Sequence, residues 1–174
     1  CFLEFVRQGE RYSLIGELAA HPKLLIIKSF TKMFGIAGLR LGYLLCGEEG
    51  IGDEIDKFGC DWNVNCVAEA AGLEALRSAD YESKVLAYVE TEREWLYEEL
   101  MRLGLKAVSG QANYLLFEAP CGTKEPLGDW LLRQGIMIRC CDDYVNLNEN
   151  FYRIGINTHE ANKVLIEKIG EWLR

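Results

Sequence analysis

The sequence predicts an α/β protein built in two parts, and three features of its hydrophobic pattern indicate this fold class. Two short apolar runs, at residues 24–27 and 41–46, have the length of strands and flank a polar segment punctuated by glycines. A long helical pattern then occupies residues 81–103. Beyond it, short strand-like and helix-like patterns alternate up to the C-terminus, which is typical of a small α/β domain.

The first part of the chain is expected to contain two strands and several short helices. Residues 12–20 have short helical character, which Pro22 ends because proline cannot continue a helix. The apolar runs at 24–27 and 41–46 are interpreted as buried strands. A short helix is expected at 53–58, and a longer one follows residues 62–65 and runs to residue 78, with Asn63 or Asn65 as its cap.

The helix at 81–103 would reach roughly 35 Å at 1.5 Å per residue, which is long enough to bridge two domains. We therefore place the domain boundary within it, near Glu94, so that the parts are residues 1–93 and 94–174. Its glutamate-rich face is interpreted as solvated. The second part is expected to hold strands at 107–108, 113–117, 136–139 and 152–156, a helix at 125–133, and a last helix that Thr158 caps.

Composition excludes several classes of protein. The formal net charge is −8, with no basic cluster, which argues against a nucleic-acid surface. No apolar run approaches the length of a membrane span and no signal-peptide pattern is present, so a cytoplasmic location is expected. The seven cysteines form no Cys-x-x-Cys pair and only two histidines accompany them, which favours free thiols and no metal site.

The segment between the two apolar runs carries groups that suit a phosphate beside an amine nucleophile. Lys32 lies on a connection between two strands, where binding and catalytic groups are often placed. Around it are hydroxyl donors, glycines that allow close backbone approach, and a fixed cation: Ser29, Thr31, Gly35, Gly38 and Arg40. The alternative, a solvated loop lysine with Arg40 in a surface ion pair, fits a lone lysine better than it fits this spaced string.

This string resembles the cofactor-lysine segment of the class I/II aminotransferase family, the pyridoxal-phosphate enzymes of fold type I. The resemblance rests on Ser29-x-x-Lys32 followed by GLRLGY at residues 38–43, and the order of the later elements extends it over essentially the whole chain. It implies that Lys32 forms a Schiff base with pyridoxal 5'-phosphate, while Ser29 and Arg40 bind the cofactor phosphate. Residues 1–93 are then the remainder of the large domain, and residues 94–174 are the small domain.

The same resemblance implies that the chain is the C-terminal half of an enzyme. Residues 1–5 are similar to those that follow the family's Asp-Glu pair, whose aspartate contacts the pyridinium nitrogen. That aspartate, the glycine-rich phosphate loop and the stacking aromatic residue have no counterpart here. By itself the chain is therefore expected to be inactive, and a folded module or dimer-forming remnant is the alternative from another class. The full-length enzyme is expected to be a homodimer.

Two arginines of the second part are candidates for binding the substrate. Arg139 ends one expected strand, and Arg153 lies within the next, which is otherwise apolar, so it needs an anionic partner. The resemblance implies that Arg153 binds the substrate α-carboxylate and Arg139 a substrate phosphate. Interior ion pairs with Asp142, Asp143 or a glutamate are the structural alternative. Asn113, just before a strand, is a weaker candidate for facing the site.

The resemblance leaves two reactions open. Both histidinol-phosphate aminotransferases and threonine-phosphate decarboxylases share the lysine, and the cofactor is the electron sink in either case. Phe30-Thr31-Lys32 with the string at 38–43, and Trp62 ahead of Val64-Asn65, resemble the decarboxylase branch somewhat more. A small phosphorylated amino compound is therefore the expected partner. In the aminotransferase alternative, Arg153 would bind the carboxylate of the amino acceptor.

Overall fold

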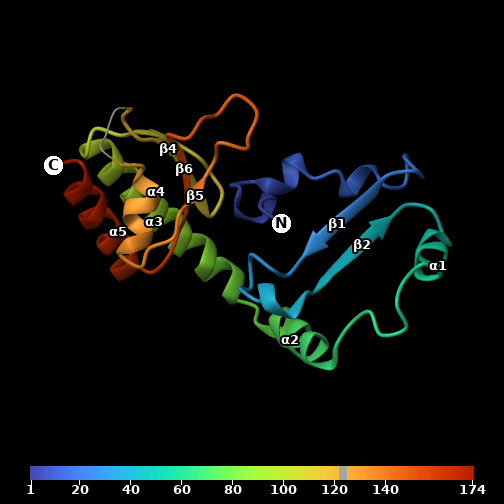
Figure 1. Cartoon of the computed structure of the whole chain (residues 1–174). Helices are drawn as coiled ribbons and strands as arrows, with labels where there is room; N and C mark the ends of the chain where they lie inside the picture. The colour runs from blue at the N-terminus through green and yellow to red at the C-terminus, as the bar shows by residue number, and fades with distance from the viewer. Residues whose placement is uncertain (122–124) are drawn as a thin grey trace. The chain divides into compact units, whose positions relative to one another are not determined.

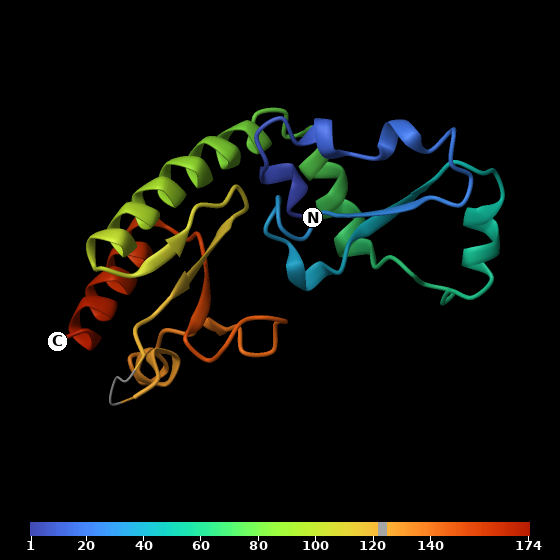
Figure 2. The same cartoon turned by 90° about the horizontal axis from the view of Figure 1, so that it is seen from above.

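The computed structural model describes residues 1–121 and 125–174, which form two compact units, Cys1–Leu86 and Ala87–Arg174 (Figures 1 and 2). The division falls inside helix α3 (Tyr81–Arg102), the long helix that the hydrophobic pattern predicts. Glu94, where the sequence analysis places the boundary, lies in the same helix. Among the helices of the described ranges, none is long and apolar enough to cross a membrane.

Unit 1, Cys1–Leu86, is built around a two-stranded antiparallel ribbon. Strand β1 (Leu25–Ser29) pairs with β2 (Gly42–Cys46), and the register runs from Leu25 opposite Cys46 to Ser29 opposite Gly42. The short elements of the unit are η1 (Leu3–Phe5), η2 (Gly9–Tyr12), η3 (Ile15–Glu17), η4 (Ala37–Leu39), α1 (Ile51–Asp56) and α2 (Cys66–Arg77). The helical character expected at 12–20 is therefore limited to single 3-10 turns.

The expectation that the two strands are buried is wrong for this chain. Ile27 is 78% exposed and Leu25 is 46% exposed. The physical reason is that the ribbon has only two strands among the described residues. The buried apolar side chains of the unit are few, namely Phe5, Met33 and Ala68.

Helix α2 begins where the sequence predicts. The Asn65 side chain accepts a hydrogen bond from the backbone N–H of Ala68 at 2.9 Å, which satisfies one of the donors that a helix start leaves unpaired. Of the two candidate caps, Asn65 therefore has this role. Asn63 instead accepts from the backbone N–H of Cys60 in the preceding turn.

Unit 2, Ala87–Arg174, holds a four-stranded antiparallel sheet in the order β3-β4-β6-β5. Its elements follow most of the expected ones: β3 (Lys106–Val108), β4 (Tyr114–Glu118), α4 (Leu127–Arg133), β5 (Arg139–Cys140), β6 (Phe151–Gly155) and α5 (His159–Trp172). The strand expected at 136–139 is shorter and begins later, since β5 pairs with β6 only at Arg139 opposite Arg153 and Cys140 opposite Tyr152.

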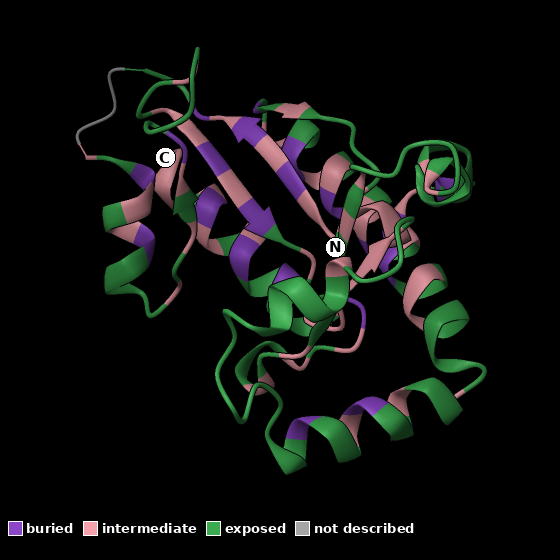
Figure 3. Ribbon diagram, turned by 90° about the vertical axis from the view of Figure 1, so that its right-hand side faces the viewer, coloured by how far each residue is buried: buried purple, intermediate pink, exposed green. Residues whose placement is uncertain are grey.

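The core of unit 2 lies between one face of the sheet and helices α3, α4 and α5 (Figure 2). Buried and half-buried residues alternate along the central strands, as Figure 3 shows. The buried set includes Leu115, Phe117, Tyr152 and Ile154 from the sheet and Leu96, Leu100, Leu127, Leu131, Leu165 and Ile169 from the helices, and it is completed by Leu105 and Ala119. Because side chains alternate, Tyr114, Leu116 and Arg153 belong to the opposite face.

The two long helices of this unit differ from expectation at one position each. Glu92 of α3 is buried, at 6% exposed, so the prediction that the glutamates of this helix are solvated is wrong for it. In α5 the Thr158 hydroxyl accepts from the N–H of Ala161, which confirms the cap. Ala161, expected on the apolar face, is exposed, and its neighbour Asn162 is buried instead.

Candidate functional site

The loop that carries Lys32 is held at both ends by the β1–β2 ribbon. The N–H of Phe30 donates to the carbonyl of Leu41 at 3.2 Å, one residue beyond the last strand pair. Within the loop, Met33 is only 3% exposed, and the ring of Phe34 stacks on that of Phe30 with centroids 5.4 Å apart. These anchors leave Lys32, which precedes Met33, exposed.

Two hydroxyls lie together at the start of this loop. The backbone N–H of Thr31 donates to Oγ of Ser29 at 3.0 Å, and the Thr31 hydroxyl is in hydrogen-bond contact with the same oxygen. This local turn is the conformation that Ser and Thr favour after a strand. The segment therefore brings the two hydroxyls together, and Lys32 directly follows Thr31 in the sequence.

The Lys32 side chain has an aromatic neighbour that sequence reasoning did not find. Its Nζ lies 5.8 Å from the centroid of the Phe2 ring, within the range of a cation–π contact. Phe2 is thirty positions away in the sequence, and no local pattern connects the two residues. Only folding brings them together.

Arg40 lies near the other end of the loop, in a left-handed backbone conformation with φ of 59°. Its Nη1 donates to the carbonyl of Ala37 at 3.1 Å, and the Asn65 side chain donates to the carbonyl of Leu39 at 3.2 Å. Asn65 thus holds the chain next to Arg40 as well as capping α2. In the described ranges Arg40 forms no ion pair, so the expected alternative of a surface pair does not occur there.

Glycines matter at two places around this loop. Gly35 has φ of +65°, which an L side chain rarely adopts. A Cβ at Gly42 would lie 2.7 Å from the carbonyl oxygen of Lys28 in the paired strand, so only glycine fits there. Gly38, which we expected to allow close backbone approach, has open space where a Cβ would be.

The donor set of the loop fits a phosphate beside an aldehyde-reactive amine. Residues 29–43 contain Ser29, Thr31, Lys32 and Arg40 and no aspartate or glutamate. Hydroxyls, ammonium and guanidinium groups donate to phosphate oxygens, and the lack of a carboxylate leaves the two cations of this loop available for an external anion. The group that these residues would suit is therefore anionic.

The nearby Lys28 has a different role. Its Nζ lies 2.8 Å from Oε1 of Glu4, and the hydrogen bond to this carboxylate raises the pKa of Lys28 above its ordinary value. Lys32 forms no such ion pair in the part of the chain that the structure describes. Of the two lysines, Lys28 is therefore structural, and Lys32 has the uncompensated charge.

In unit 2, Arg153 lies half-buried on the face of the sheet opposite the core. Its guanidinium carbon is 5.1 Å from the centroid of the Tyr114 ring, and its Nη1 donates to the Tyr144 hydroxyl at 3.3 Å. Within residues 1–121 and 125–174 it forms no ion pair. The alternative of an interior ion pair is therefore not what holds Arg153. Sequence reasoning missed Tyr144, which lies in an irregular loop with no periodic signal.

Arg139 lies directly opposite Arg153 in the β5–β6 register. It forms an ion pair with Asp143, which is one of the partners expected if Arg139 has a structural role and does not bind substrate. Both side chains are about half exposed, at 50% and 57%, so the pair is on the surface and is not interior. An exposed pair of this kind contributes little stability and exchanges readily.

Asn113, the weaker candidate, accepts from the N–H of Ile156 through its backbone carbonyl.

The family model for aminotransferase class I and II matches residues 2–169. The chain is 30% identical over 169 residues to the putative threonine-phosphate decarboxylase of Caldanaerobacter subterraneus subsp. tengcongensis, covering 97% of this chain and 46% of that protein. It is 32% identical over 172 residues to the histidinol-phosphate aminotransferase of Nitratidesulfovibrio vulgaris, covering 99% of this chain and 45% of that protein.

Solved structures show the same likeness. The histidinol-phosphate aminotransferase from Clostridium acetobutylicum superposes with a TM-score of 0.88 at 30% identity, over 99% of this chain and 52% of that one. The Sinorhizobium meliloti enzyme of that name, in complex with pyridoxal-5'-phosphate, shares the fold with a TM-score of 0.86 at 23% identity, over 98% of this chain and 46% of that one.

The chain spans about half the length of the curated relatives it matches. The expected fold class is confirmed, because the described α/β structure matches part of the fold type I architecture. Both resemblances expected from the sequence, to decarboxylases and to aminotransferases, occur among the relatives. The chain belongs to the class I and II aminotransferases, a family of pyridoxal-phosphate-dependent enzymes.

Proposed function

We propose that this chain supplies the cofactor lysine and the substrate arginines of a pyridoxal-phosphate enzyme. The observation that carries the proposal is the loop 29–43, which contains two hydroxyls in contact, a lysine and an arginine, with no carboxylate among its residues. A loop held at both ends by paired strands keeps these groups in place without a bound partner.

Each residue of the loop has a distinct task in this proposal. The cofactor, when bound, supplies the electron sink for loss of a group from the substrate α carbon. The Lys32 amine binds the aldehyde and later moves a proton at that α carbon. The hydroxyls of Ser29 and Thr31 and the guanidinium of Arg40 donate to the phosphate. The Phe2 ring lies within cation–π distance of the amine.

For the substrate, we favour an amino acid that carries a phosphate, and a decarboxylation of the threonine-phosphate type. Arg139 and Arg153 lie directly opposite each other in adjacent strands, and like charges in that position destabilise a sheet unless anions compensate them. In the structure the Asp143 carboxylate compensates the charge of Arg139. Because this ion pair is exposed and weak, a substrate phosphate could readily replace Asp143 as the partner of Arg139. Arg153 would bind the carboxylate and Arg139 the phosphate.

Histidinol-phosphate transamination is the second candidate. It is supported by the likeness to the Clostridium acetobutylicum structure and to the Nitratidesulfovibrio vulgaris enzyme. Histidinol phosphate has no α-carboxylate, so Arg153 would serve the carboxylate of the amino acceptor. Lys32, Ser29 and Arg40 keep the same tasks in both reactions.

Borohydride reduction tests the assignment of Lys32. The full-length protein is supplied with pyridoxal phosphate, reduced, digested and mapped by mass spectrometry. We expect a pyridoxyl label on Lys32 and none on Lys28, which is paired with Glu4 and serves as the internal control. A label on another lysine, or no label at all, would remove Lys32 from the proposed role.

Product analysis separates the two reactions. Phosphothreonine is offered alone, and histidinol phosphate is offered with 2-oxoglutarate, while carbon dioxide and glutamate are measured. Carbon dioxide from phosphothreonine supports the decarboxylase, whereas glutamate formation without it moves the protein to the aminotransferase reaction.

We also propose that the full-length enzyme is a cytoplasmic homodimer. Helix α2 leaves large apolar side chains exposed, namely Val67 at 60%, Leu73 at 49% and Leu76 at 69%. Leu73 and Leu76, three positions apart, lie on the same side of the helix, and exposed apolar patches are typical of a surface that another chain covers. Sedimentation equilibrium of the full-length protein tests this, and a monomer at micromolar concentration would contradict it.

A further inference from the structure

Glu92 is unusual among the acids of helix α3. It is only 6% exposed, whereas Glu94, one half-turn further along, is exposed. Burying a carboxylate is costly unless hydrogen bonds satisfy its oxygens. The hydrogen-bond partners of the Glu92 carboxylate therefore indicate its structural role.

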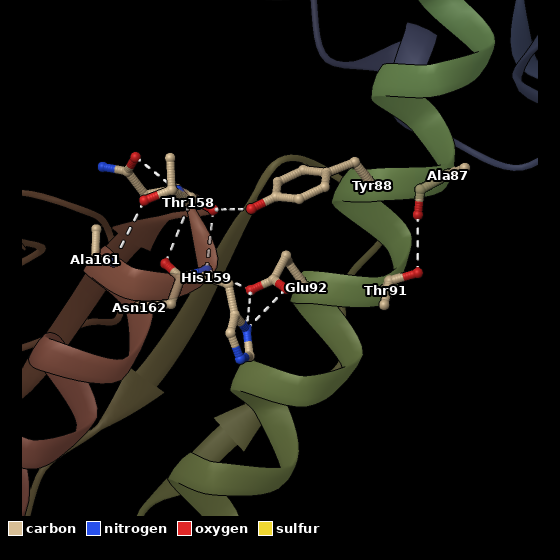
Figure 4. Close-up of polar contacts among 9 residues, drawn as sticks. Ala87, Tyr88, Thr91, Glu92, Thr158, His159, Ala161 and Asn162 are labelled. Carbon is tan, nitrogen blue, oxygen red and sulfur yellow. Dashed lines mark hydrogen bonds and ion pairs between the residues drawn. The ribbon is translucent and has the colours of Figure 1, made fainter.

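The partners of Glu92 come from the start of helix α5, as Figure 4 shows. Nδ1 of His159 lies 2.9 and 3.1 Å from the two carboxylate oxygens, and Nδ2 of Asn162 donates to one of them at 2.9 Å. The ring of Trp95, one turn along α3, packs edge-on against the imidazole with centroids 4.8 Å apart. A single carboxylate thus holds two side chains of α5 against α3.

The Asn162 side chain also forms two hydrogen bonds with the backbone of Asn157. Its Nδ2 donates to the carbonyl of Asn157 at 3.1 Å, and its Oδ1 accepts from the N–H of the same residue at 3.2 Å. The amide has one orientation, because the reverse would place its oxygen against the Glu92 carboxylate. The Tyr88 hydroxyl, also from α3, donates to the same carbonyl at 3.3 Å. Asn157 is therefore clamped at both of its backbone groups.

Asn157 lies just after strand β6, which carries Arg153. The neighbouring Ile156 donates to the carbonyl of Asn113, which extends the β6–β4 pairing beyond Gly155. Helix α3 also holds the start of β4, because Nη1 of Arg93 donates to the carbonyls of Gln111 and Ala112 at 2.9 and 3.3 Å.

Consecutive turns of α3 thus anchor the end of one strand and the start of its neighbour. Arg153 and Tyr114 lie on these two strands and contact each other at 5.1 Å. A shift of β6 relative to β4 would move the guanidinium off the ring and away from the Tyr144 hydroxyl. Helix α3 therefore contacts the chain next to both of the strands that carry this pair.

We infer that Glu92 is a positioning residue, whose buried contacts with His159 and Asn162 hold strand β6 so that Arg153 meets the anionic group of the substrate. The inference rests on the proposed role of Arg153 in binding that group. Glu92 itself touches neither substrate nor cofactor in this proposal. Its effect is therefore expected on substrate binding and not on the lysine chemistry of unit 1.

The test compares Glu92→Gln with Glu94→Gln in the full-length holoenzyme, using the substrate that the product analysis identifies. Glu92→Gln keeps the volume but sets an amide N–H₂ against other donors, so we expect KM to rise about tenfold, because small displacements of a binding group have large effects. kcat and the pyridoxyl labelling of Lys32 are expected to change less than about twofold. Glu94→Gln, on an exposed position of the same helix, should match the wild type.

A double-mutant cycle separates positioning from a purely structural role. In an Arg153→Ala background, Glu92→Gln should raise KM no further, because the group it positions is already gone. A further tenfold rise would overturn the inference. An unchanged KM in Glu92→Gln, together with a raised KM in Arg153→Ala, removes only the role of Glu92. An unchanged KM in Arg153→Ala removes the proposed function of Arg153 itself, and the inference with it.

Tyr88→Phe keeps the inference testable if Glu92→Gln does not fold. Tyr88 is 45% exposed, and the substitution deletes one hydroxyl that donates to the Asn157 carbonyl. We expect KM to rise about twofold, in line with one neutral hydrogen bond, with thermal stability nearly unchanged. Hydrogen exchange at the Asn157 amide should become faster in the same variant. If both KM and exchange equal those of the wild type, the clamp on Asn157 has no part in substrate binding.

Discussion

The two units of the chain differ in how completely they bury their apolar residues. Unit 2 encloses twelve buried residues in one core between its sheet and three helices. Unit 1 buries three apolar side chains and leaves Phe58 and Trp62 at 90% and 91% exposed. Hydrophobic burial is the dominant favourable term in folding, so the two units have different means of holding the candidate residues Lys32 and Arg153.

Unit 2 positions Arg153 on a sheet whose other face is fully packed. Unit 1 positions Lys32 mainly through local contacts, such as the strand pairing around the loop and the buried Met33. In the described residues, the loop of unit 1 is thus formed with few buried apolar side chains around it.

Separating the units should show the contrast directly. A cut before Tyr81 keeps α3 whole, so residues 81–174 contain the complete core of unit 2. We expect this piece to unfold cooperatively in urea with a stability of about 5 kcal/mol, whereas residues 1–80 should show no sharp transition. Circular dichroism measures the unfolding of each piece as the urea concentration rises. A cooperative transition of residues 1–80 would contradict the comparison.

Single truncations should have unequal costs in the two units. Phe117→Ala, at a fully buried position of unit 2, is expected to reduce the free energy of unfolding by about 3 to 5 kcal/mol. Ile27→Ala, which is 78% exposed in unit 1, should change it by less than about 0.5 kcal/mol. Urea denaturation of the whole chain measures both. Equal costs would show that Ile27 is buried in solution.

The Lys28–Glu4 pair gives unit 1 a pH-dependent contribution. Because Glu4 raises the pKa of Lys28, the pair stabilises fully below the ordinary lysine pKa, and its contribution is lost as pH rises through the raised value. Oε2 of Glu4 is buried with no hydrogen-bond partner among the described residues, which offsets part of the gain. We therefore expect Glu4→Gln to cost about 1 kcal/mol at pH 7.

Urea midpoints of the wild type and Glu4→Gln should begin to converge above about pH 10.5, the ordinary lysine pKa, and should meet above the raised pKa of Lys28. The matched pair in unit 2 is Lys106–Glu118, with the Lys106 side chain 81% exposed. Glu118→Gln should therefore have the smaller effect at pH 7. Midpoints that differ equally from pH 7 to pH 11 would refute the role of the Lys28 charge.

Thiol reactivity should give the smallest effect, with no change in stability. Cys141 of unit 2 is 2% exposed, and burial raises its pKa, so its reactive thiolate is scarce. Cys66 of unit 1 is exposed. At pH 8 iodoacetamide should label Cys66 at least about tenfold faster than Cys141, as measured by peptide mass mapping. Equal rates would mean that unit 2 opens readily at β5.

Much of the local structure, and the order of the donor groups in the loop, can be predicted from the sequence alone. Strand runs, the caps Asn65 and Thr158, and the helix from Tyr81 follow from periodicity and from hydrogen bonds within a few residues. The string around Lys32 has its donors close together in the chain, so spacing alone predicts that they belong to one site. These features are local, and short-range physics decides them.

Contacts between residues far apart in the sequence became visible only in the folded structure. The exposure of β1, the Phe2 ring beside Lys32, and the Tyr114 and Tyr144 partners of Arg153 have no signal in the spacing of residues. Glu92 appeared to be one more solvated glutamate of α3. Its burial depends on His159 and Asn162, sixty-seven and seventy positions away, because only packing of α5 against α3 brings them into hydrogen-bonding distance.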